Sequence, residues 1–345
     1  MTGGTALRIN YLLASTELFG GVKVVLHHAS LLARRGHLVR VVSPGAPPDW
    51  YPLEAEFVRV PSLEDPELPE ADVTVATFWT TIAPALESPG SGAVVHYCQG
   101  FEGDLTHNEA EHPDIMAAYR NPLPAFTVSE PLAHMIRTRF GRPAMVVPPA
   151  LEPVWRPGLR LGPRRRPRVL VTGPFENSVK DPRTAIEAVD LLRRRGVRAV
   201  LVRLSQWPLT GAERELLPPD EFHCNLPPAG VPRLLRSCDL LLAPSTAQEG
   251  FGLPVLEAMA CGLPVVASEI PSFRWFAREA AVLVPPGDPA AFAEAAAGLL
   301  GARGRWREHR ARGLEVAGAF REESVVETLE SALQRVASGR WGAGP

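Results

Sequence analysis

Short apolar runs alternate with segments of helical spacing along most of this chain, and this alternation limits the fold more than any other feature. In the N-terminal half, the apolar runs 7–13 and 38–42 flank residues 22–35, where apolar side chains recur at helical spacing. Gly36 follows as a helix stop. Such alternation predicts a parallel sheet with helices on both faces. Further strands are expected at 57–60, 73–76, 93–97, 125–128 and 144–147.

A second alternation begins at 169–172. It follows residues 156–168, which are rich in Pro, Gly and Arg and have no periodicity, as is typical of a linker. Helices are expected at 183–195, 231–237, 254–261, 289–300 and 322–336, and strands at 197–204, 239–243, 264–267 and 281–284. We therefore predict two Rossmann-like domains, residues 1–155 and 169–320, joined by the linker 156–168. Residues 321–345 are expected to form a C-terminal helix and tail that packs back toward the N-terminal domain.

Composition excludes several classes of protein. The 345 residues are enough for two domains, and the net charge of −2 argues against nucleic acid as a partner. The four cysteines are widely spaced, and we interpret them as reduced thiols in the core of a cytosolic protein. We find no signal peptide and no apolar stretch of about 18 residues that could span a bilayer. A cytoplasmic location is therefore expected.

The most informative segment for function is 240–262. Its apolar run 240–243 predicts a buried strand, and Gly250 and Gly252 predict a tight turn before a helix that begins near Pro254. The free N–H groups and the dipole of that helix N-terminus attract anions. Glu249 and Glu257 frame the turn, and carboxylates accept hydrogen bonds from hydroxyl groups. The segment therefore suits a ligand that carries both phosphate and sugar hydroxyls.

This segment resembles the Glu-x7-Glu motif of retaining glycosyltransferases of the GT-B fold, in the family called GT4. The resemblance runs from about residue 7 to about residue 335 and is strongest at 239–287. It implies that Glu249 touches the donor sugar and that Glu257 binds the ribose hydroxyls of a nucleotide. The amides from Gly250 through Phe251 and Gly252 to Leu253 would hold the sugar and the diphosphate.

Other donor-binding residues are predicted in two glycine-containing loops. Gly20 and Gly21 open the first helix and resemble the family's Gly-Gly-Val entry, although the pattern alone also fits an ordinary tight turn. Lys180 matches a family lysine that faces the diphosphate. The family's usual arginine is replaced by Pro174, so that Arg183 is a candidate substitute. Trp275 stands where the family often has an acidic residue.

Three residues near the end of the strand 93–97 are candidates for the acceptor side. His96 resembles a family histidine that faces the reacting sugar, whereas a lone histidine is more often structural. Gln99 and Glu102 follow on the loop and are predicted to contact the acceptor. The catalytic residues implied by the resemblance are then Glu249, His96 and Lys180.

The resemblance predicts a GT-B enzyme in which two parallel sheets face a central cleft. It would move a sugar, with retention of configuration, from a nucleoside diphosphate sugar to an unidentified acceptor. No Asp-x-Asp motif indicates a metal, and no other cofactor is expected. A nucleotide-sugar epimerase of the same fold and a degenerate sugar-nucleotide-binding protein are the alternatives. Five arginines around Trp306 fit peripheral contact with the inner membrane surface, but an exposed polar helix is the favoured interpretation. The oligomeric state is not predicted.

Overall fold

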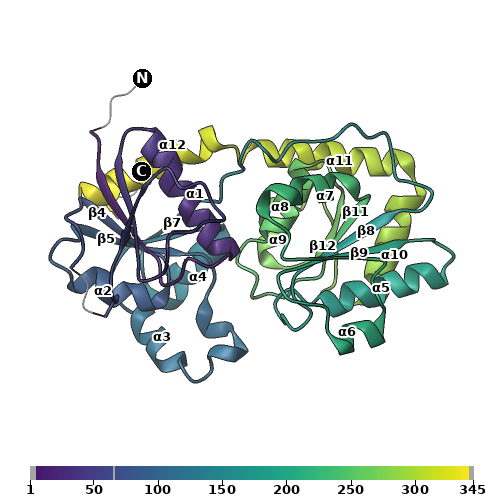
Figure 1. Cartoon of the computed structure of the whole chain (residues 1–345), viewed down its shortest axis with the longest axis horizontal. Helices are drawn as coiled ribbons and strands as arrows, with labels where there is room; N and C mark the ends of the chain where they lie inside the picture. The colour runs from purple at the N-terminus through teal and green to yellow at the C-terminus, as the bar shows by residue number, and fades with distance from the viewer. Residues whose placement is uncertain (1–4, 65–66, 342–345) are drawn as a thin grey trace. The chain divides into compact units, whose positions relative to one another are not determined.

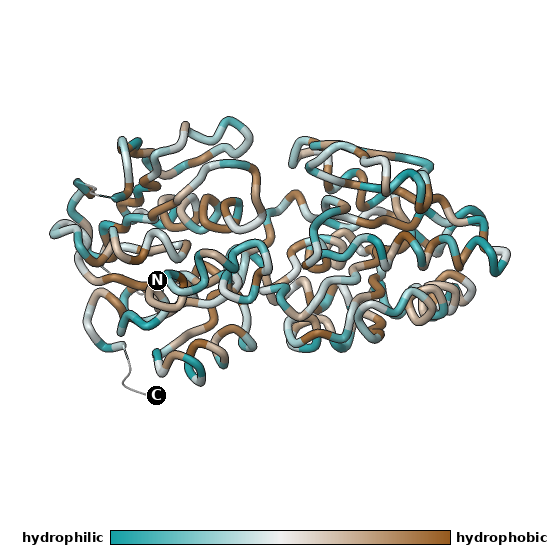
Figure 2. Tube along the Cα trace, turned by 90° about the horizontal axis from the view of Figure 1, so that it is seen from below, coloured by the Kyte–Doolittle hydropathy of each residue, from teal (hydrophilic) through white to brown (hydrophobic). Residues whose placement is uncertain are grey.

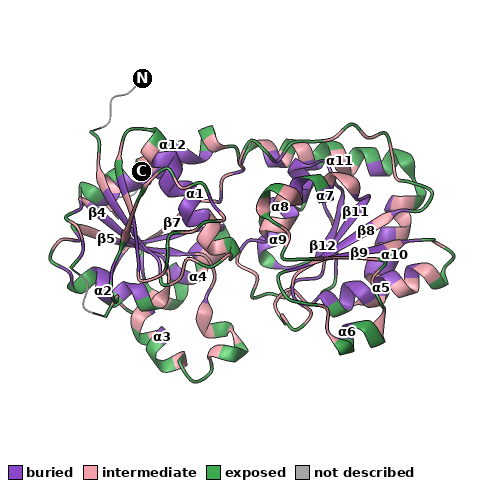
Figure 3. Cartoon of the chain, in the orientation of Figure 1, coloured by how far each residue is buried: buried purple, intermediate pink, exposed green. Residues whose placement is uncertain are grey.

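The computed structural model describes residues 5–64 and 67–341, and their contacts divide the chain into two units. Unit 1 is the chain up to Ala150 together with the part from Glu322 onward, and unit 2 is Leu151–Arg321. Each unit is a parallel sheet with helices on both faces (Figure 1). Buried residues concentrate in the strands (Figure 3), and hydrophobic residues recur along the trace of both units (Figure 2). This architecture confirms the predicted α/β class with two Rossmann-like units.

Among the described residues, the sheet of unit 1 has the strand order β3-β2-β1-β4-β5-β6-β7, all parallel. The strands are β1 (Arg8–Leu12), β2 (Leu38–Ser43), β3 (Glu56–Arg59), β4 (Val73–Ala76), β5 (Ala93–Cys98), β6 (Ala125–Thr127) and β7 (Ala144–Val146). The helices are α1 (Gly20–Arg34), α2 (Ile82–Glu87), α3 (His112–Tyr119), α4 (Glu130–Phe140) and α12 (Glu322–Ala337), with the short 3-10 turns η1 (Trp79–Thr81), η2 (Glu102–Asp104) and η3 (Thr106–Asn108).

Side chains of β5 alternate between the two faces of this sheet, as a pleated strand requires. Tyr97 stacks on His28 of α1, with ring centroids 5.5 Å apart. Its neighbour His96 points the other way and meets Tyr119 of α3 edge-on at 5.0 Å. Helices α1 and α12 thus cover one face, and α2, α3 and α4 bury apolar side chains against the other.

The sheet of unit 2 has the order β10-β9-β8-β11-β12-β13 among the described residues, again all parallel. The strands are β8 (Arg168–Thr172), β9 (Val200–Ser205), β10 (Glu221–Cys224), β11 (Leu240–Ala243), β12 (Val265–Ser268) and β13 (Val282–Val284). The helices are α5 (Pro182–Arg194), α6 (Gly211–Leu216), α7 (Val231–Ser237), α8 (Leu253–Ala260), α9 (Pro271–Phe276), α10 (Pro289–Gly301) and α11 (Arg303–Gly318), with the 3-10 turn η4 (Pro228–Gly230). One apolar cluster joins α5 and α10 to β8 and β11, and α8 packs against α11.

The C-terminal helix α12 packs on α1 of unit 1 through charged pairs. Glu322 lies 2.7 Å from His27 Nε2, and Glu330 lies 2.8 Å from Arg35 and 3.1 Å from His37 Nε2. His37 Nδ1 accepts a hydrogen bond from a backbone N–H at 3.0 Å, so that Nε2 carries the proton shared with Glu330. The hydrogen bond from Arg35 lowers the pKa of Glu330 below its ordinary value.

Several elements were not predicted from the sequence. The helices α2, α3, α4, α6, α9 and α11 and the strand β10 are missing from the expected list. Strand β10 has four residues and lies at the edge of its sheet, where its side chains are half-buried or exposed. It therefore lacks the continuous apolar run that marks a buried strand. Cys224 at its end is exposed, which corrects the prediction that all four cysteines are core thiols. Cys98, Cys238 and Cys261 are buried as expected.

Candidate active site

The carboxyl ends of β8 and β11 meet in the middle of the unit 2 sheet. The strand order reverses between these two neighbours, because β9 and β10 lie beyond β8 whereas β12 and β13 lie beyond β11. In open α/β sheets, ligands bind outside the carboxyl ends of the strands at such a reversal. The loop after β8 carries Lys180, and the loop after β11 carries Glu249.

These two loops bring Lys180 and Glu249 into direct contact. Lys180 Nζ lies 2.5 Å from Glu249 Oε2, and Ser245 donates to the same oxygen at 3.1 Å. The side chain of Glu249 is only 10% exposed and that of Lys180 is 27% exposed. A backbone hydrogen bond of 2.8 Å from Thr246 to Val179 also ties the loops together. An ammonium and a carboxylate are therefore held side by side at the sheet edge.

The loop that carries Lys180 has its own internal support. Asn177 Oδ1 accepts hydrogen bonds from the backbone N–H groups of Val179 and Lys180 at 3.1 and 3.0 Å. Asp181 takes the left-handed conformation, with a φ of 43°, and caps α5 through Thr184. A capped helix start fixes the path of the chain after Lys180, because the cap satisfies N–H groups that would otherwise be free.

A buried ion pair supports the same loop from below. Arg203 of β9 donates to the carbonyls of Val171 and Gly173 at 2.7 and 2.8 Å, and its Nε lies 2.5 Å from Glu213 Oε1. Both charged side chains are almost fully buried. Arg203 is completely inaccessible, so it does not replace the phosphate-facing arginine that the sequence lacks at position 174.

A small pocket opens beside the Lys180–Glu249 pair, at the N-terminus of α8. Besides that pair, its lining comes from the ends of β8 and β11, from the start of α8 and from one residue of α9: Thr172, Leu242, Ala243, Pro244, Ser245, Gly252, Pro254, Val255 and Phe273. A carboxylate, an ammonium and a helix N-terminus therefore border one space. This combination suits a ligand with hydroxyl groups and a phosphate.

Gly252 shapes this pocket for two reasons. Its φ is +94°, a conformation that side chains disfavour, and a Cβ there would lie 2.2 Å from a ring carbon of Phe273. The neighbouring Phe251 is buried, and its ring stacks on Phe276 at 4.6 Å. Any contact of Phe251 with a donor would therefore come from its backbone, as the predicted amide contacts require.

We expect Gly252→Ala to destabilise the protein and to weaken donor binding. The left-handed backbone costs about 1–2 kcal/mol with a side chain, and displacing Phe273 adds about 1–3 kcal/mol. Gly211→Ala is the matched control, because Gly211 starts α6 without a positive φ and a Cβ there would meet nothing within 4 Å. The measurement is the melting temperature with and without nucleotide. Equal melting temperatures for the two variants would contradict the prediction.

The remaining donor candidates of unit 2 lie around this centre. The guanidinium of Arg183 lies 5.0 Å above the ring of Phe175 and 4.0 Å from Glu187, and its side chain is 55% exposed. Glu257 is half-buried on α8. The donor contacts of both residues remain predictions.

The structure brings together two of the candidates in unit 1. Gln99 Nε2 donates to the carbonyl of Gly21 at 3.0 Å, and a Cβ on Gly21 would lie 3.2 Å from that amide. Gly20 and Gly21 form the first turn of α1, directly after the loop from β1. Gln99 thus holds the N-terminus of α1 against the end of β5. The ligand contacts proposed for these three residues remain predictions.

His96 is completely buried between α3 and the sheet. Neither ring nitrogen has a hydrogen-bond partner among the described residues, and burial holds the pKa of His96 well below its ordinary value. The ring is therefore neutral and has no surface for a ligand in this conformation. Its predicted catalytic role remains a prediction that would require the ring to become accessible.

Part of this chain matches a known protein family. Residues 166–302, which include the Lys180 and Glu249 loops, match the family model described as "Glycosyl transferases group 1". The part of this chain that carries the candidate site is therefore similar to group 1 glycosyltransferases. The phosphatidyl-myo-inositol mannosyltransferase of Mycobacterium tuberculosis is 26% identical over 314 residues, which cover 80% of this chain and 81% of that protein. Its counterpart from Mycobacterium leprae is 47% identical, but over only 21% of this chain and 20% of its own length.

Solved structures confirm the GT-B fold of this chain. Sucrose-phosphate synthase from Thermosynechococcus elongatus superposes with a TM-score of 0.78 at 17% identity, covering 96% of this chain and 99% of that one. Anabaena HepE in complex with UDP-glucose gives a TM-score of 0.76 at 15% identity, covering 95% and 99%. At such low identities the likeness concerns the fold alone.

Glu102 is half-buried in a polar cluster at the end of β5. The hydroxyl of Tyr119 donates to Glu102 Oε2 at 2.5 Å and lies 3.4 Å from the thiol of Cys98. Burial raises the pKa of Glu102 to about 7 and that of Cys98 to about 12. A carboxyl group that titrates near neutrality can hold or release a proton there, and its contact with the acceptor stays a prediction.

We expect Glu102→Gln to remove a pH dependence of stability. Burial raises the pKa of Glu102 in the folded protein from 4.5 to about 7, so the folded state favours the protonated side chain. The resulting contribution to stability is complete below the unfolded-state pKa and is lost as the pH rises through about 7. The amide mimics the protonated acid, so the variant should gain stability over the native protein at about pH 8 relative to about pH 6. Melting curves test this, with the exposed Glu109→Gln as control. If the difference in melting temperature between Glu102→Gln and the native protein were the same at both pH values, the prediction would be wrong.

Three features of the site were not predicted from the sequence. Ser245 follows the strand β11 closely, and its position near a strand end was the available signal. Arg203 interrupts an apolar run, which marks a charged residue that needs a buried partner. Phe273 comes from a different helix and gave no signal.

Among the described residues, no three His, Cys, Asp or Glu side chains are grouped so that they could bind a metal ion. No helix of the described residues has both the length and the apolar composition of a membrane span.

Proposed function

We propose that this protein transfers a hexosyl group from a nucleoside diphosphate sugar to a hydroxyl group of an acceptor, with retention of configuration. The observation that carries this proposal is the Lys180–Glu249 pair at the pocket beside the α8 N-terminus. A donor of this class presents sugar hydroxyls and a diphosphate close together. A carboxylate recognises the first and an ammonium the second.

In the proposed reaction, the bond between the anomeric carbon and the diphosphate oxygen breaks. The acceptor oxygen bonds to the same face of that carbon, and its proton passes to the departing diphosphate. Lys180 and the α8 N-terminus stabilise the charge that develops on the leaving group. Glu249 orients the sugar through its hydroxyls, while Ser245 and Lys180 hold that carboxylate in place. Protein groups then take the place that a metal ion has in other transferases.

Two comparisons guide the choice of substrates for a test. A structural neighbour was solved with UDP-glucose, and a relative is named as a mannosyltransferase acting on phosphatidyl-myo-inositol. UDP-glucose and GDP-mannose are therefore the first donors to test, and phosphatidylinositol is the first acceptor. We propose these as members of the substrate class.

The test is a panel of nucleoside diphosphate sugars incubated with and without acceptor, in buffer containing a chelator. We expect one donor to give nucleoside diphosphate and an α-linked product only when acceptor is present, as read by phosphate and proton NMR. An altered sugar without acceptor would indicate an epimerase. Donor-dependent thermal stabilisation without turnover of any pair would indicate a binding protein. Either outcome would overturn the proposal. If a donor and acceptor react only when the chelator is left out, the proposal that the reaction needs no metal ion is wrong.

A further inference from the structure

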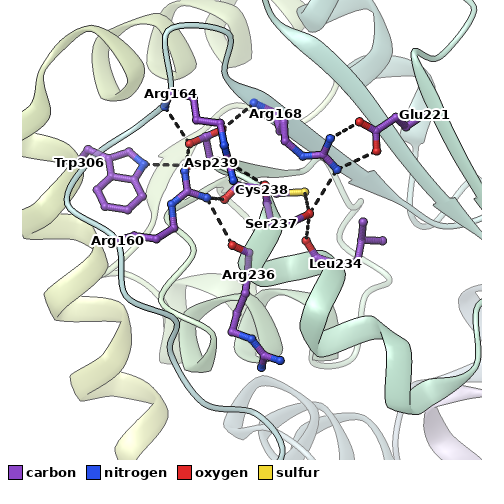
Figure 4. A network of polar contacts seen from close by, with 10 residues as sticks. All are labelled: Arg160, Arg164, Arg168, Glu221, Leu234, Arg236, Ser237, Cys238, Asp239 and Trp306. Carbon is purple, nitrogen blue, oxygen red and sulfur yellow. Dashed lines mark hydrogen bonds and ion pairs between the residues drawn. The ribbon is translucent and has the colours of Figure 1, made fainter.

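The segment 156–164 is fastened to the surface of unit 2 by buried polar contacts. Arg160 and Arg164 both pair with the carboxylate of Asp239, which is completely buried (Figure 4). The backbone N–H groups of Arg164 and Arg168 donate to the same carboxylate at 3.0 and 2.8 Å. This segment, predicted as a solvated linker, therefore has a fixed path along unit 2.

Helix α11 holds the same segment from the outside. Arg303 and Arg307 both donate through Nε to the carbonyl of Leu161, at 2.7 and 2.8 Å, and Arg310 donates to the carbonyl of Gly158 at 2.7 Å. Trp306 of the same helix is completely buried and donates to the carbonyl of Asp239 at 2.8 Å. Trp306 is therefore not available as a membrane anchor.

The fixed path turns two leucines outward. Arg160 points into the protein toward Asp239, and the residues on either side of it, Leu159 and Leu161, are 97% and 61% exposed. Leu159 has the largest exposed fraction among the large hydrophobic residues described. An exposed leucine on a flexible tail would carry little meaning, but here the backbone is held on both sides by hydrogen bonds. Exposed apolar side chains on a rigid, fixed segment indicate a contact surface.

Arginines surround the two leucines. Arg303 and Arg307 contact the carbonyl of Leu161 itself, and Arg165 and Arg166 continue the same exposed segment. Within the described ranges, none of these four arginines takes part in an ion pair, so their positive charges are not neutralised by the protein. We call Leu159, Leu161, Arg165, Arg166, Arg303 and Arg307 the linker surface.

We propose that the linker surface binds the surface of an anionic lipid bilayer. Two apolar side chains can enter the boundary between headgroups and acyl chains, while the arginines pair with lipid phosphates. A nucleic acid would meet the same arginines but would leave both leucines in water. The surface lies on unit 2 and shares no residue with the pocket beside Lys180, so the proposal does not depend on the proposed function.

The experiment measures sedimentation of the full chain with vesicles in the absence of any sugar donor. The vesicles contain phosphatidylcholine alone or a mixture with phosphatidylglycerol, at low and at high salt. We expect binding to the anionic vesicles that weakens with salt. The double change Leu159→Ser and Leu161→Ser should lower the partition coefficient roughly tenfold. Arg165→Gln with Arg166→Gln should lower it about fivefold for each arginine, as about 1 kcal/mol per basic residue implies.

The matched control is Leu38→Ser with Leu86→Ser, two leucines of unit 1 that are 45% and 44% exposed. This variant should bind vesicles like the native protein. The proposal is overturned if the native chain does not sediment, if it binds neutral vesicles equally well, or if both linker-surface variants bind unchanged. A shift in oligomeric state on changing Leu159 and Leu161, seen by light scattering, would instead assign the surface to a second copy. Activity toward a water-soluble acceptor should be the same in all variants.

Discussion

Alanine in place of Glu249 is expected to lower kcat/KM for the nucleotide-sugar donor by roughly 10- to 100-fold. A hydrogen bond to a charged group contributes about 1.5–3 kcal/mol, and such a loss in the transition state corresponds to one to two decades in rate. The structure adds a second effect, because Glu249 also holds Lys180 at 2.5 Å. Without the carboxylate, the Lys180 ammonium is no longer held where it would contact the diphosphate. Steady-state kinetics with each variant, after confirming its melting temperature, provide the measurement.

The contact between the two side chains makes this prediction sharper. Lys180→Ala should also lower kcat/KM strongly, and the double variant should lose less than the sum of the single losses, because residues in contact do not act independently. Glu176→Ala is the matched control, since Glu176 is an exposed acid of the same loop. Near-native kinetics for Glu249→Ala would remove this residue from the site. A larger loss for Arg183→Ala than for Lys180→Ala would make Arg183 the main phosphate cation.

The second large effect is expected at Asp239, which the proposed reaction does not use. Its carboxylate is completely buried and serves Arg160, Arg164 and two backbone N–H groups. Asp239→Ala removes the acceptor of both backbone N–H groups and the counter-charge of both arginines, which keep only their hydrogen bonds to carbonyl groups. Breaking a buried pair in this way typically costs about 3–5 kcal/mol. We expect a marked fall in the stability of unit 2 and release of the segment 156–164. Denaturant unfolding followed by tryptophan fluorescence measures this, since Trp306 adjoins the network.

An exposed ion pair gives the control for Asp239. Glu308 and Arg312 pair at 2.7 Å on the surface of α11, with both side chains about half exposed. Glu308→Ala should cost less than about 1 kcal/mol, because exposed pairs gain little from their attraction in water. If Asp239→Ala were as mild as Glu308→Ala, the carboxylate would not be the element that fixes the segment. Asp239→Asn should fall between them, since it keeps the shape and loses the charge.

The strands of both sheets were predictable because most of them are buried on both faces. Runs such as 240–243 are continuously apolar, and a parallel sheet covered by helices demands that composition. Elements that lack such an apolar pattern were not predicted. The helix α11 carries five arginines among its exposed and half-buried positions and has few apolar residues. Its position in the fold depends on the burial of Trp306 and on hydrogen bonds to the carbonyls of the segment 156–164. The spacing of residues within the helix cannot predict these distant partners.

The sequence by itself determined the fold class, the glycine turn at 250–252 and the acidic residue beside it, because these depend on local periodicity and on backbone conformations that few residues adopt. Only the tertiary structure decided which of these residues are in contact. Lys180 and Glu249 are 69 positions apart and meet because β8 and β11 are neighbours at the strand-order reversal. Tertiary packing likewise buried His96 and Trp306 and turned Leu159 outward. Burial and charge pairing depend on residues distant in the chain, so that no local pattern can encode them.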